Sequence, residues 1–264
     1  MFRPGNLPLI IAHRGASAHA PENTIAAFRA AVDAGADGIE FDVRLAKDGV
    51  PVVIHDRTLN RTGRINGTVP AMTSAELANV DVGSWFRDLA PNPSIANFAG
   101  ESVPTLERTL EFLADFRGTL YIELKCGDGD VERLARAVSE ILSASPLLPQ
   151  VIVKSFKLGV IPIFRTGCPH VRTAALFAPK IMRYLRKEKY LVKIAEELGA
   201  DSLSIHYSLA TRKLMKRVEK RGLPVTIWTA DNPRWIKRAL KLGLNAIITN
   251  DPAKLLARRA EIQG

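Results

Sequence analysis

Eight short runs of aliphatic and β-branched residues recur along the chain, and most are followed by a stretch with the spacing of an amphipathic helix. Alternating strands and helices predict an α/β fold with a parallel sheet. Eight such units in 264 residues favour a closed (β/α)₈ barrel, the TIM-barrel fold, as a single domain over residues 1–264. A doubly wound open sheet is the alternative, but no Gly-x-Gly-x-x-Gly pattern follows the first run. The runs are residues 9–12, 38–43, 120–124, 151–154, 171–176, 202–205, 225–229 and 246–249.

Two places interrupt this alternation. Only seven residues separate the run at 38–43 from the apolar residues 51–54, which is too short for a parallel crossover. We therefore expect an antiparallel hairpin extension after the second strand, turning near Asp48-Gly49, with paired residue numbers that sum to about 97. The second interruption, at about 56–104, carries a capping-box pattern at 73–76 and is predicted to be a functional insertion before the third barrel strand.

Charge is unevenly distributed along the chain. Residues 1–130 carry 12 basic and 17 acidic side chains, whereas residues 131–264 carry 25 basic and 10 acidic ones. Most of the basic excess lies at 180–193, 212–221 and 234–241, where basic and apolar residues alternate at the spacing of solvated helices. No binding motif accompanies these clusters, so a nucleic-acid partner is not expected, and weak association with an anionic membrane stays open.

The cellular compartment is predicted from cysteine usage and from the distribution of apolar residues. Cys126 and Cys168 fit no metal or redox spacing, so we expect free thiols in a reducing compartment. The N-terminus lacks a signal-peptide pattern, and no segment approaches the ~20 apolar residues of a membrane span. These features favour a cytoplasmic protein and do not indicate an oligomeric state.

Carboxylates occupy two of the predicted strands. Side chains two apart on a strand share a face, so Glu40 and Asp42 point the same way, as do Glu123 and Lys125. A carboxylate inside a barrel is disfavoured unless it is paired or coordinates a metal. Three carboxylates at the carboxyl ends of neighbouring strands suit a hard cation such as Mg²⁺ or Ca²⁺. Ion pairs with Arg14 and Lys125 are the alternative.

Two histidines are expected at the same end of the barrel. His13 ends the first run, and the hairpin pairing places His55 opposite Asp42. Imidazole titrates near neutral pH, so two histidines beside an acidic metal site would supply the acid and the base for phosphodiester cleavage. Because barrel active sites lie on the loops after the strands, His13 and Arg14 would face a bound phosphate. Gly15 would let the backbone approach that phosphate closely.

An ordered set of motifs then gives a resemblance. The set comprises IAHRG at 11–15, PENT at 21–24, GIEFDV at 38–43 followed by KDG and VVIHD, VGSWF at 82–86, VPTLE at 103–107, YIELK at 121–125, SF at 155–156 and TIWTADN at 226–232. With these motifs the chain resembles the glycerophosphodiester phosphodiesterase family of phospholipase C-like barrels. The resemblance implies a metal-dependent hydrolase that releases sn-glycerol 3-phosphate and an alcohol from deacylated phospholipids, using one divalent cation, Mg²⁺ or Ca²⁺.

The resemblance also implies a role for each matched residue. The catalytic pair would be His13 and His55, the metal ligands Glu40, Asp42 and Glu123, the phosphate contacts Arg14 and Lys125, the substrate-pocket aromatic Trp228, and the supporting residues Glu22 and Asn23.

One departure from the family pattern is visible. The family often has Thr-Asp-x-Pro after the last strand, where this chain has TNDP at 249–252. We expect this difference to change only the capping of the last helix. A related barrel phospholipase, a lyase acting on lysophospholipids and a noncatalytic anionic-lipid-binding protein remain as alternatives.

Overall fold

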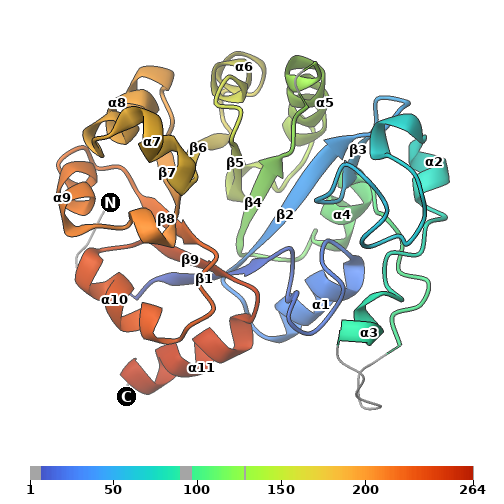
Figure 1. Ribbon diagram of the computed structural model, residues 1–264, viewed down its shortest axis with the longest axis horizontal. Helices are drawn as coiled ribbons and strands as arrows, with labels where there is room; N and C mark the ends of the chain where they lie inside the picture. Colours follow the sequence, from blue (N-terminus) through green and yellow to red (C-terminus); the bar gives the residue numbers. More distant parts are fainter. Residues whose placement is uncertain (1–6, 90–96, 128, 264) are drawn as a thin grey trace.

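The computed structural model describes residues 7–89, 97–127 and 129–263, in which eight parallel strands close into a barrel (Figure 1). Strand β1 pairs with both β2 and β9, which closes the sheet. This arrangement confirms the predicted (β/α)₈ barrel. The barrel strands are β1 (Leu9–His13), β2 (Gly38–Leu45), β4 (Thr119–Leu124), β5 (Val151–Ser155), β6 (Arg172–Phe177), β7 (Ser202–His206), β8 (Val225–Trp228) and β9 (Ala246–Thr249).

Helices surround the barrel and bury their apolar faces against the outside of the strands (Figure 1). The helices that follow the barrel strands are α1 (Ile25–Asp33), α4 (Leu106–Phe112), α5 (Val131–Ser143), α6 (Val160–Gly167), α8 (Lys189–Leu198), α9 (Arg212–Glu219), α10 (Arg234–Leu242) and α11 (Pro252–Gln263). Phe28 of α1 packs on Phe41 of β2 with 5.6 Å between ring centroids. The outward face of β2 is therefore apolar, as its alternation predicts, and its inward face carries the carboxylates. Among the described helices, none is long and apolar enough to cross a membrane.

The barrel interior is apolar near the amino ends of the strands and charged near their carboxyl ends. The apolar layer consists of Ile11, Tyr121, Ile152, Ala174, Ala246 and Ile248. The Tyr121 hydroxyl lies 2.9 Å from the Thr226 hydroxyl across this layer. Because residues two further along the same strands share the inward face, Glu123 and Lys154 lie in the next layer toward the carboxyl ends.

Strand β3 (Pro51–Val53) pairs antiparallel with the extended end of β2, as predicted. The connection is a three-residue turn at 47–49, closed by a hydrogen bond from the Ala46 backbone N–H to the Val50 carbonyl. Gly49 has a φ of +84°, a left-handed conformation that glycine adopts without steric cost.

The register of this hairpin differs from the prediction by one residue. Val43 pairs with Val53, so the paired numbers sum to 96 rather than 97. Ile54, not His55, lies opposite Asp42, and its backbone N–H donates to the Asp42 carbonyl at 2.9 Å. The prediction centred the turn between two residues, whereas a three-residue turn is centred on Asp48. His55 is therefore the first residue beyond the pairing.

The described residues of the predicted insertion include three short helices, η1 (Val69–Ala71), α2 (Ser74–Leu77) and α3 (Phe86–Leu89). Helices α2 and α3 lie on one side of the barrel (Figure 1). The predicted capping box at 73–76 is present, with Thr73 and Glu76 each bonding to the backbone of the other. Apolar residues of the insertion and the hairpin form a small separate core, made of Ala46, Val52, Ile54, Leu59, Val69, Leu77, Val80, Val82 and Val103. Part of the predicted insertion, residues 90–96, lies outside the described residues.

The basic clusters lie mainly on the outer ring of helices, but the cluster at 180–193 differs from the prediction. Helices α8, α9 and α10 bury their apolar residues and expose most of their basic ones, as predicted. The cluster at 180–193, however, is not one helix. It consists of η3 (Pro179–Ile181), α7 (Met182–Leu185) and the start of α8, interrupted at Arg186, which has a φ of +55°. Because residues 180–187 follow β6 directly, they lie at the carboxyl end of the barrel.

Candidate active site

Three carboxylates meet inside the barrel at the carboxyl ends of β2 and β4. One oxygen each from Glu40, Asp42 and Glu123 lies within 4.8 Å of the others. The parallel pairing places Asp42 directly beside Glu123, and alternation places Glu40 two positions below Asp42 on the same face. All three side chains are buried. A buried, all-oxygen donor set fits a hard divalent cation such as Mg²⁺ or Ca²⁺.

Arg14 and Lys125 also contact this cluster. Arg14 Nε lies 3.1 Å from Asp42 Oδ2, and Lys125 Nζ lies 3.2 Å from Asp42 Oδ1 and pairs with Glu123. Burial raises the pKa of Asp42, but the Lys125 and Arg14 cations outweigh it and hold that pKa well below its ordinary value. The predicted ion pairs are therefore present, and they use the same carboxylates as the proposed cation would.

Lys154 is a third cation of the cluster, and sequence reasoning assigned it no role. Its side chain is fully buried, with Nζ 2.8 Å from Glu40 Oε1 and 3.4 Å from Glu123 Oε2. The pairing of β5 with β4 sets Lys154 directly beside Glu123. Burial lowers the pKa of Lys154, but the two carboxylates raise it above its ordinary value, so the side chain is a cation. The available signal was a lone lysine inside the apolar run VIVKS.

The PENT motif lies beside the cluster on the loop between β1 and α1. Asn23 donates from Nδ2 to Asp42 Oδ2 at 3.0 Å and accepts from the Asp42 backbone N–H at 3.1 Å. Thr24 caps α1 by accepting from the Ala27 backbone N–H. Glu22 pairs with Arg14 at 2.7 Å. These contacts fit the predicted supporting roles of Glu22 and Asn23.

Gly15 has a packing role that the sequence did not predict. Its φ is +81°, and a Cβ atom there would lie 2.6 Å from the backbone of Ala27 in α1. Glycine is therefore required for the loop to pass close to the helix. Arg14, the preceding residue, also has a positive φ, of +57°, which aims its side chain back toward Asp42. Close approach of Gly15 to a phosphate remains a prediction.

His13 lies at the end of β1, with Nε2 3.9 Å from Glu40 Oε2. Its other ring nitrogen, Nδ1, lies 2.6 Å from Asn250 Oδ1. Asn250 belongs to the TNDP sequence that departs from the resembled family. The expectation that this departure changes only helix capping is wrong, because Asn250 contacts His13 while Asp251 caps α11 by accepting from the Lys254 backbone N–H.

His55 lies just beyond β3 and is held by an acidic neighbour. Its Nδ1 lies 2.7 Å from Asp56 Oδ1, and Asp56 Oδ2 accepts a hydrogen bond from Arg61 Nε at 2.7 Å. Burial lowers the pKa of His55 below its ordinary value, and the Lys125 and Arg14 cations act in the same direction, although Asp42 and Asp56 oppose them. His55 is thus biased toward the neutral imidazole.

Aromatic side chains surround the mouth of the barrel near Trp228. Trp228 ends β8 and makes edge contacts with Phe156 and His206, at centroid distances of 5.6 and 5.3 Å. Phe156 is 45% exposed and lies over Lys125, with Nζ 5.8 Å from the ring centroid. Trp228 therefore lies at the carboxyl end of the barrel, and its contact with the substrate remains a prediction. Phe156 belongs to the SF motif at 155–156, but its contacts with Trp228 and Lys125, and the contact of His206 with Trp228, follow only from the fold.

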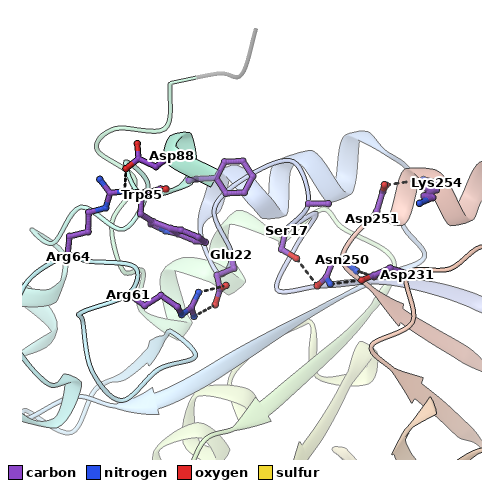
Figure 2. A pocket seen from close by; sticks show the side chains of 12 residues that line it. Ser17, Glu22, Arg61, Arg64, Trp85, Asp88, Asp231, Asn250, Asp251 and Lys254 are labelled. Atoms are coloured by element: carbon purple, nitrogen blue, oxygen red, sulfur yellow. Dashed lines mark hydrogen bonds and ion pairs between the residues drawn. The ribbon is translucent and has the colours of Figure 1, made fainter. Parts of the chain in front are cut away.

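A pocket of about 800 Å³ lies between the β1–α1 loop, the insertion and the loops that follow β8 and β9. Figure 2 shows Glu22 bonded to Arg61 below Trp85 on one side, and Asn250 bonded to Ser17 and Asp231 on the other. Glu22 connects the pocket to the carboxylate cluster through Arg14, and Asn250 connects it to His13.

Comparisons with known proteins identify the family. Residues 13–254 match the model of the glycerophosphoryl diester phosphodiesterase family. The chain belongs to this family. It is an enzyme of the glycerophosphodiester phosphodiesterase type, as the resemblance implied.

Relatives of the family match this phosphodiesterase over almost its whole length. It is 35% identical over 252 residues to the glycerophosphodiester phosphodiesterase of Caldanaerobacter subterraneus subsp. tengcongensis, covering 94% of this chain and 96% of the relative. It is 30% identical over 251 residues to a Bacillus subtilis glycerophosphodiester phosphodiesterase, covering 92% and 84%. Among solved structures, it matches an Oleispira antarctica phosphodiesterase in complex with the product sn-glycerol 3-phosphate, with a TM-score of 0.85, 27% identity and 98% coverage of both chains.

Proposed function

We propose that this enzyme cleaves glycerophosphodiesters to sn-glycerol 3-phosphate and an alcohol, with His13 and His55 as the acid–base pair. The proposal rests on the hydrogen-bond partner of each of the two histidine rings. Nδ1 of His13 lies against Asn250 and Nδ1 of His55 lies against Asp56, so Nε2 of each ring is left for proton transfer. His13 Nε2 lies 3.9 Å from Glu40 Oε2 of the carboxylate cluster. The related Oleispira antarctica enzyme, in complex with sn-glycerol 3-phosphate, supports this product.

The remaining residues would bind and neutralise the phosphate. Arg14 and Lys125 are cations whose side chains reach Asp42, and they would donate to the non-bridging phosphate oxygens, where charge grows in the transition state. A divalent cation held by Glu40, Asp42 and Glu123 would supply Lewis-acid stabilisation of the same charge. Trp228 would contact the substrate from the opposite wall. The histidines would each transfer one proton, a contribution of roughly 10²–10⁴-fold for each transfer.

The setting of the reaction is part of the proposal. We propose a small-molecule glycerophosphodiester substrate from phospholipid breakdown and a cytoplasmic location. Both cysteines are free thiols, as predicted, which fits a reducing compartment.

A release assay tests the proposed activity. The protein would be incubated with glycerophosphocholine and with glycerophosphoethanolamine plus Mg²⁺ or Ca²⁺, and sn-glycerol 3-phosphate would be measured with a coupled dehydrogenase. We expect release from at least one diester. Cyclic phosphate products from lysophospholipids, with no turnover of either deacylated diester, would instead establish the lyase alternative.

Lys154→Met is predicted to strengthen cation binding and weaken the metal-free fold. The change removes a buried positive charge from beside Glu40 and Glu123, so the affinity for Mg²⁺ or Ca²⁺ is expected to rise by about tenfold or more. Without a bound cation, the unpaired carboxylates are expected to cost ~3–5 kcal/mol in the free energy of unfolding. Titration calorimetry and urea denaturation measure the two effects. Lys241→Met, on the exposed face of α10, is the matched control and should change neither; unchanged metal affinity in Lys154→Met would contradict the prediction.

The basic surface is predicted to be separate from catalysis. We propose that contact with an anionic membrane is weak and involves residues 180–187, which expose Arg183, Tyr184 and Arg186 at the carboxyl end of the barrel. Reversing Arg183 and Arg186 to Glu is expected to reduce sedimentation with anionic vesicles at low salt, and to leave kcat/KM on glycerophosphocholine within about twofold. Reversing Lys213 and Lys216 on α9 should change neither quantity. A salt-sensitive fall of about tenfold or more in kcat/KM for either pair would show that the basic surface steers the substrate.

A further inference from the structure

The side chain of Asn250 bridges His13 and Asp231 across the ends of three strands. His13 ends β1, Asp231 follows β8 and Asn250 follows β9. Asn250 Oδ1 lies 2.6 Å from His13 Nδ1, and Asn250 Nδ2 donates to Asp231 Oδ2 at 2.8 Å (Figure 2 shows the second contact). Ser17 adds a hydroxyl that donates to Asn250 Oδ1 at 3.1 Å.

The hydrogen-bond partners determine which way the Asn250 amide points. An ionised carboxylate only accepts hydrogen bonds, so the atom of Asn250 that faces Asp231 must be the NH₂ group. Asp231 is held in place because its Oδ1 accepts from the Thr249 hydroxyl at 2.9 Å and from the Asn250 backbone N–H at 2.8 Å. The carbonyl oxygen of Asn250 therefore faces His13 and Ser17, where it accepts from both.

This orientation also selects the form of the His13 ring. Because Asn250 Oδ1 is an acceptor, Nδ1 of His13 carries the ring hydrogen, and Nε2 of the neutral ring presents its lone pair. Nε2 is the nitrogen that lies 3.9 Å from Glu40, beside the carboxylate cluster. In the other tautomer, Nε2 would carry the ring hydrogen and point an N–H toward the carboxylate cluster. Nδ1 would then face Asn250 Oδ1 with no hydrogen between the two atoms.

We propose that Asn250 and Asp231 are positioning residues, which hold His13 in the Nδ1–H tautomer and aim Nε2 at the reacting phosphate. His55 is held by one carboxylate directly, whereas His13 is held by an amide that a carboxylate orients in turn. The proposal rests on the proposed function for its effect on turnover. The tautomer itself can be measured without substrate.

The test combines four variants with two measurements. Asn250→Leu removes the acceptor, and Asp231→Asn removes the group that orients the Asn250 amide. The exchange variant Asn250→Asp/Asp231→Asn swaps acid and amide, so that residue 250 still accepts from His13 and residue 231 still pairs with it. Asn245→Leu is the matched control, because Asn245 precedes β9 at the opposite end of the barrel and accepts from the Val225 backbone N–H. The measurements are steady-state kinetics on glycerophosphocholine with added Mg²⁺, and ¹⁵N chemical shifts of the histidine rings, with His13 assigned by its loss in His13→Gln.

The expected results separate positioning from simple stability. Asn250→Leu and Asp231→Asn should lower kcat by about 10²-fold with KM within about threefold, because a misplaced catalytic group loses rate rather than affinity. Both should lose the Nδ1–H signature of His13, and the exchange variant should regain it together with kcat within about tenfold of the wild type. Asn245→Leu should keep kcat and the signature. An unchanged His13 tautomer in Asn250→Leu, or a loss confined to KM, would overturn the proposal. An inactive wild type that retains the Nδ1–H signature would instead count against the proposed function.

Discussion

His13→Ala and His55→Ala are each expected to lower kcat on glycerophosphodiesters by about 10²–10⁴-fold, because each would remove one proton-transfer group. The fold should survive both changes. His13 and His55 are part-buried residues at strand exits, and the apolar core between the strands and the helices contains neither of them. Cation binding should also persist, since the proposed ligands are Glu40, Asp42 and Glu123. Steady-state kinetics and titration calorimetry on the same preparations measure both quantities.

His170→Ala is the control for these two variants. His170 is exposed in the connection between α6 and β6, at the amino end of the barrel, and it should be replaceable without loss of turnover. Near wild-type kcat in His55→Ala would rule out the proposed acid–base pair. A loss of cation binding in either variant would instead assign the histidine to the metal site.

Removal of divalent cations is expected to abolish turnover without unfolding the protein. Loss of the cation would remove charge stabilisation worth several kcal/mol in the transition state. The metal-free fold should persist because Arg14, Lys125 and Lys154 pair with the three carboxylates and leave no buried negative charge uncompensated. Activity after dialysis against EDTA and the thermal unfolding transition measure the two effects.

Readdition experiments complete this test. Mg²⁺ or Ca²⁺ should restore turnover, since both prefer carboxylate oxygens. The cation that restores turnover at the lower concentration would be the one that the site prefers. Full activity in excess EDTA, with no metal retained by elemental analysis, would refute the cation requirement. Unfolding on chelation would show that the ion pairs do not compensate the carboxylates.

The hairpin shows how far local patterns reach. The short spacing between β2 and β3 predicted the antiparallel pairing correctly, because no parallel crossover fits in seven residues. The register was wrong by one residue, because it depends on whether the turn has two or three residues. A one-residue slip normally reverses which face a side chain occupies, yet His55 still lies near Asp42 because it lies beyond the last paired residue.

The barrel and the inward direction of Glu40, Asp42 and Glu123 could be predicted from the amino-acid sequence alone. Both follow from periodicity, which is a local property: alternation within a strand fixes the face, and strand–helix repetition fixes the fold class. Motifs also predicted that His13, Arg14 and Lys125 lie at the carboxyl end of the barrel, because each residue ends a barrel strand or directly follows one.

The distant residues that complete the cluster and orient the histidines could be found only from the closed barrel. Lys154 joins Glu123 through the pairing of β5 with β4, and Asn250 meets His13 across 237 positions of sequence because closure of the barrel brings β9 beside β1. No spacing rule relates such residues, since their distance depends on strand order and register rather than on separation along the chain. The Asn250 amide is oriented by Asp231, which lies on a third loop, the one after β8. Asn250 can therefore position His13 only once the barrel is closed.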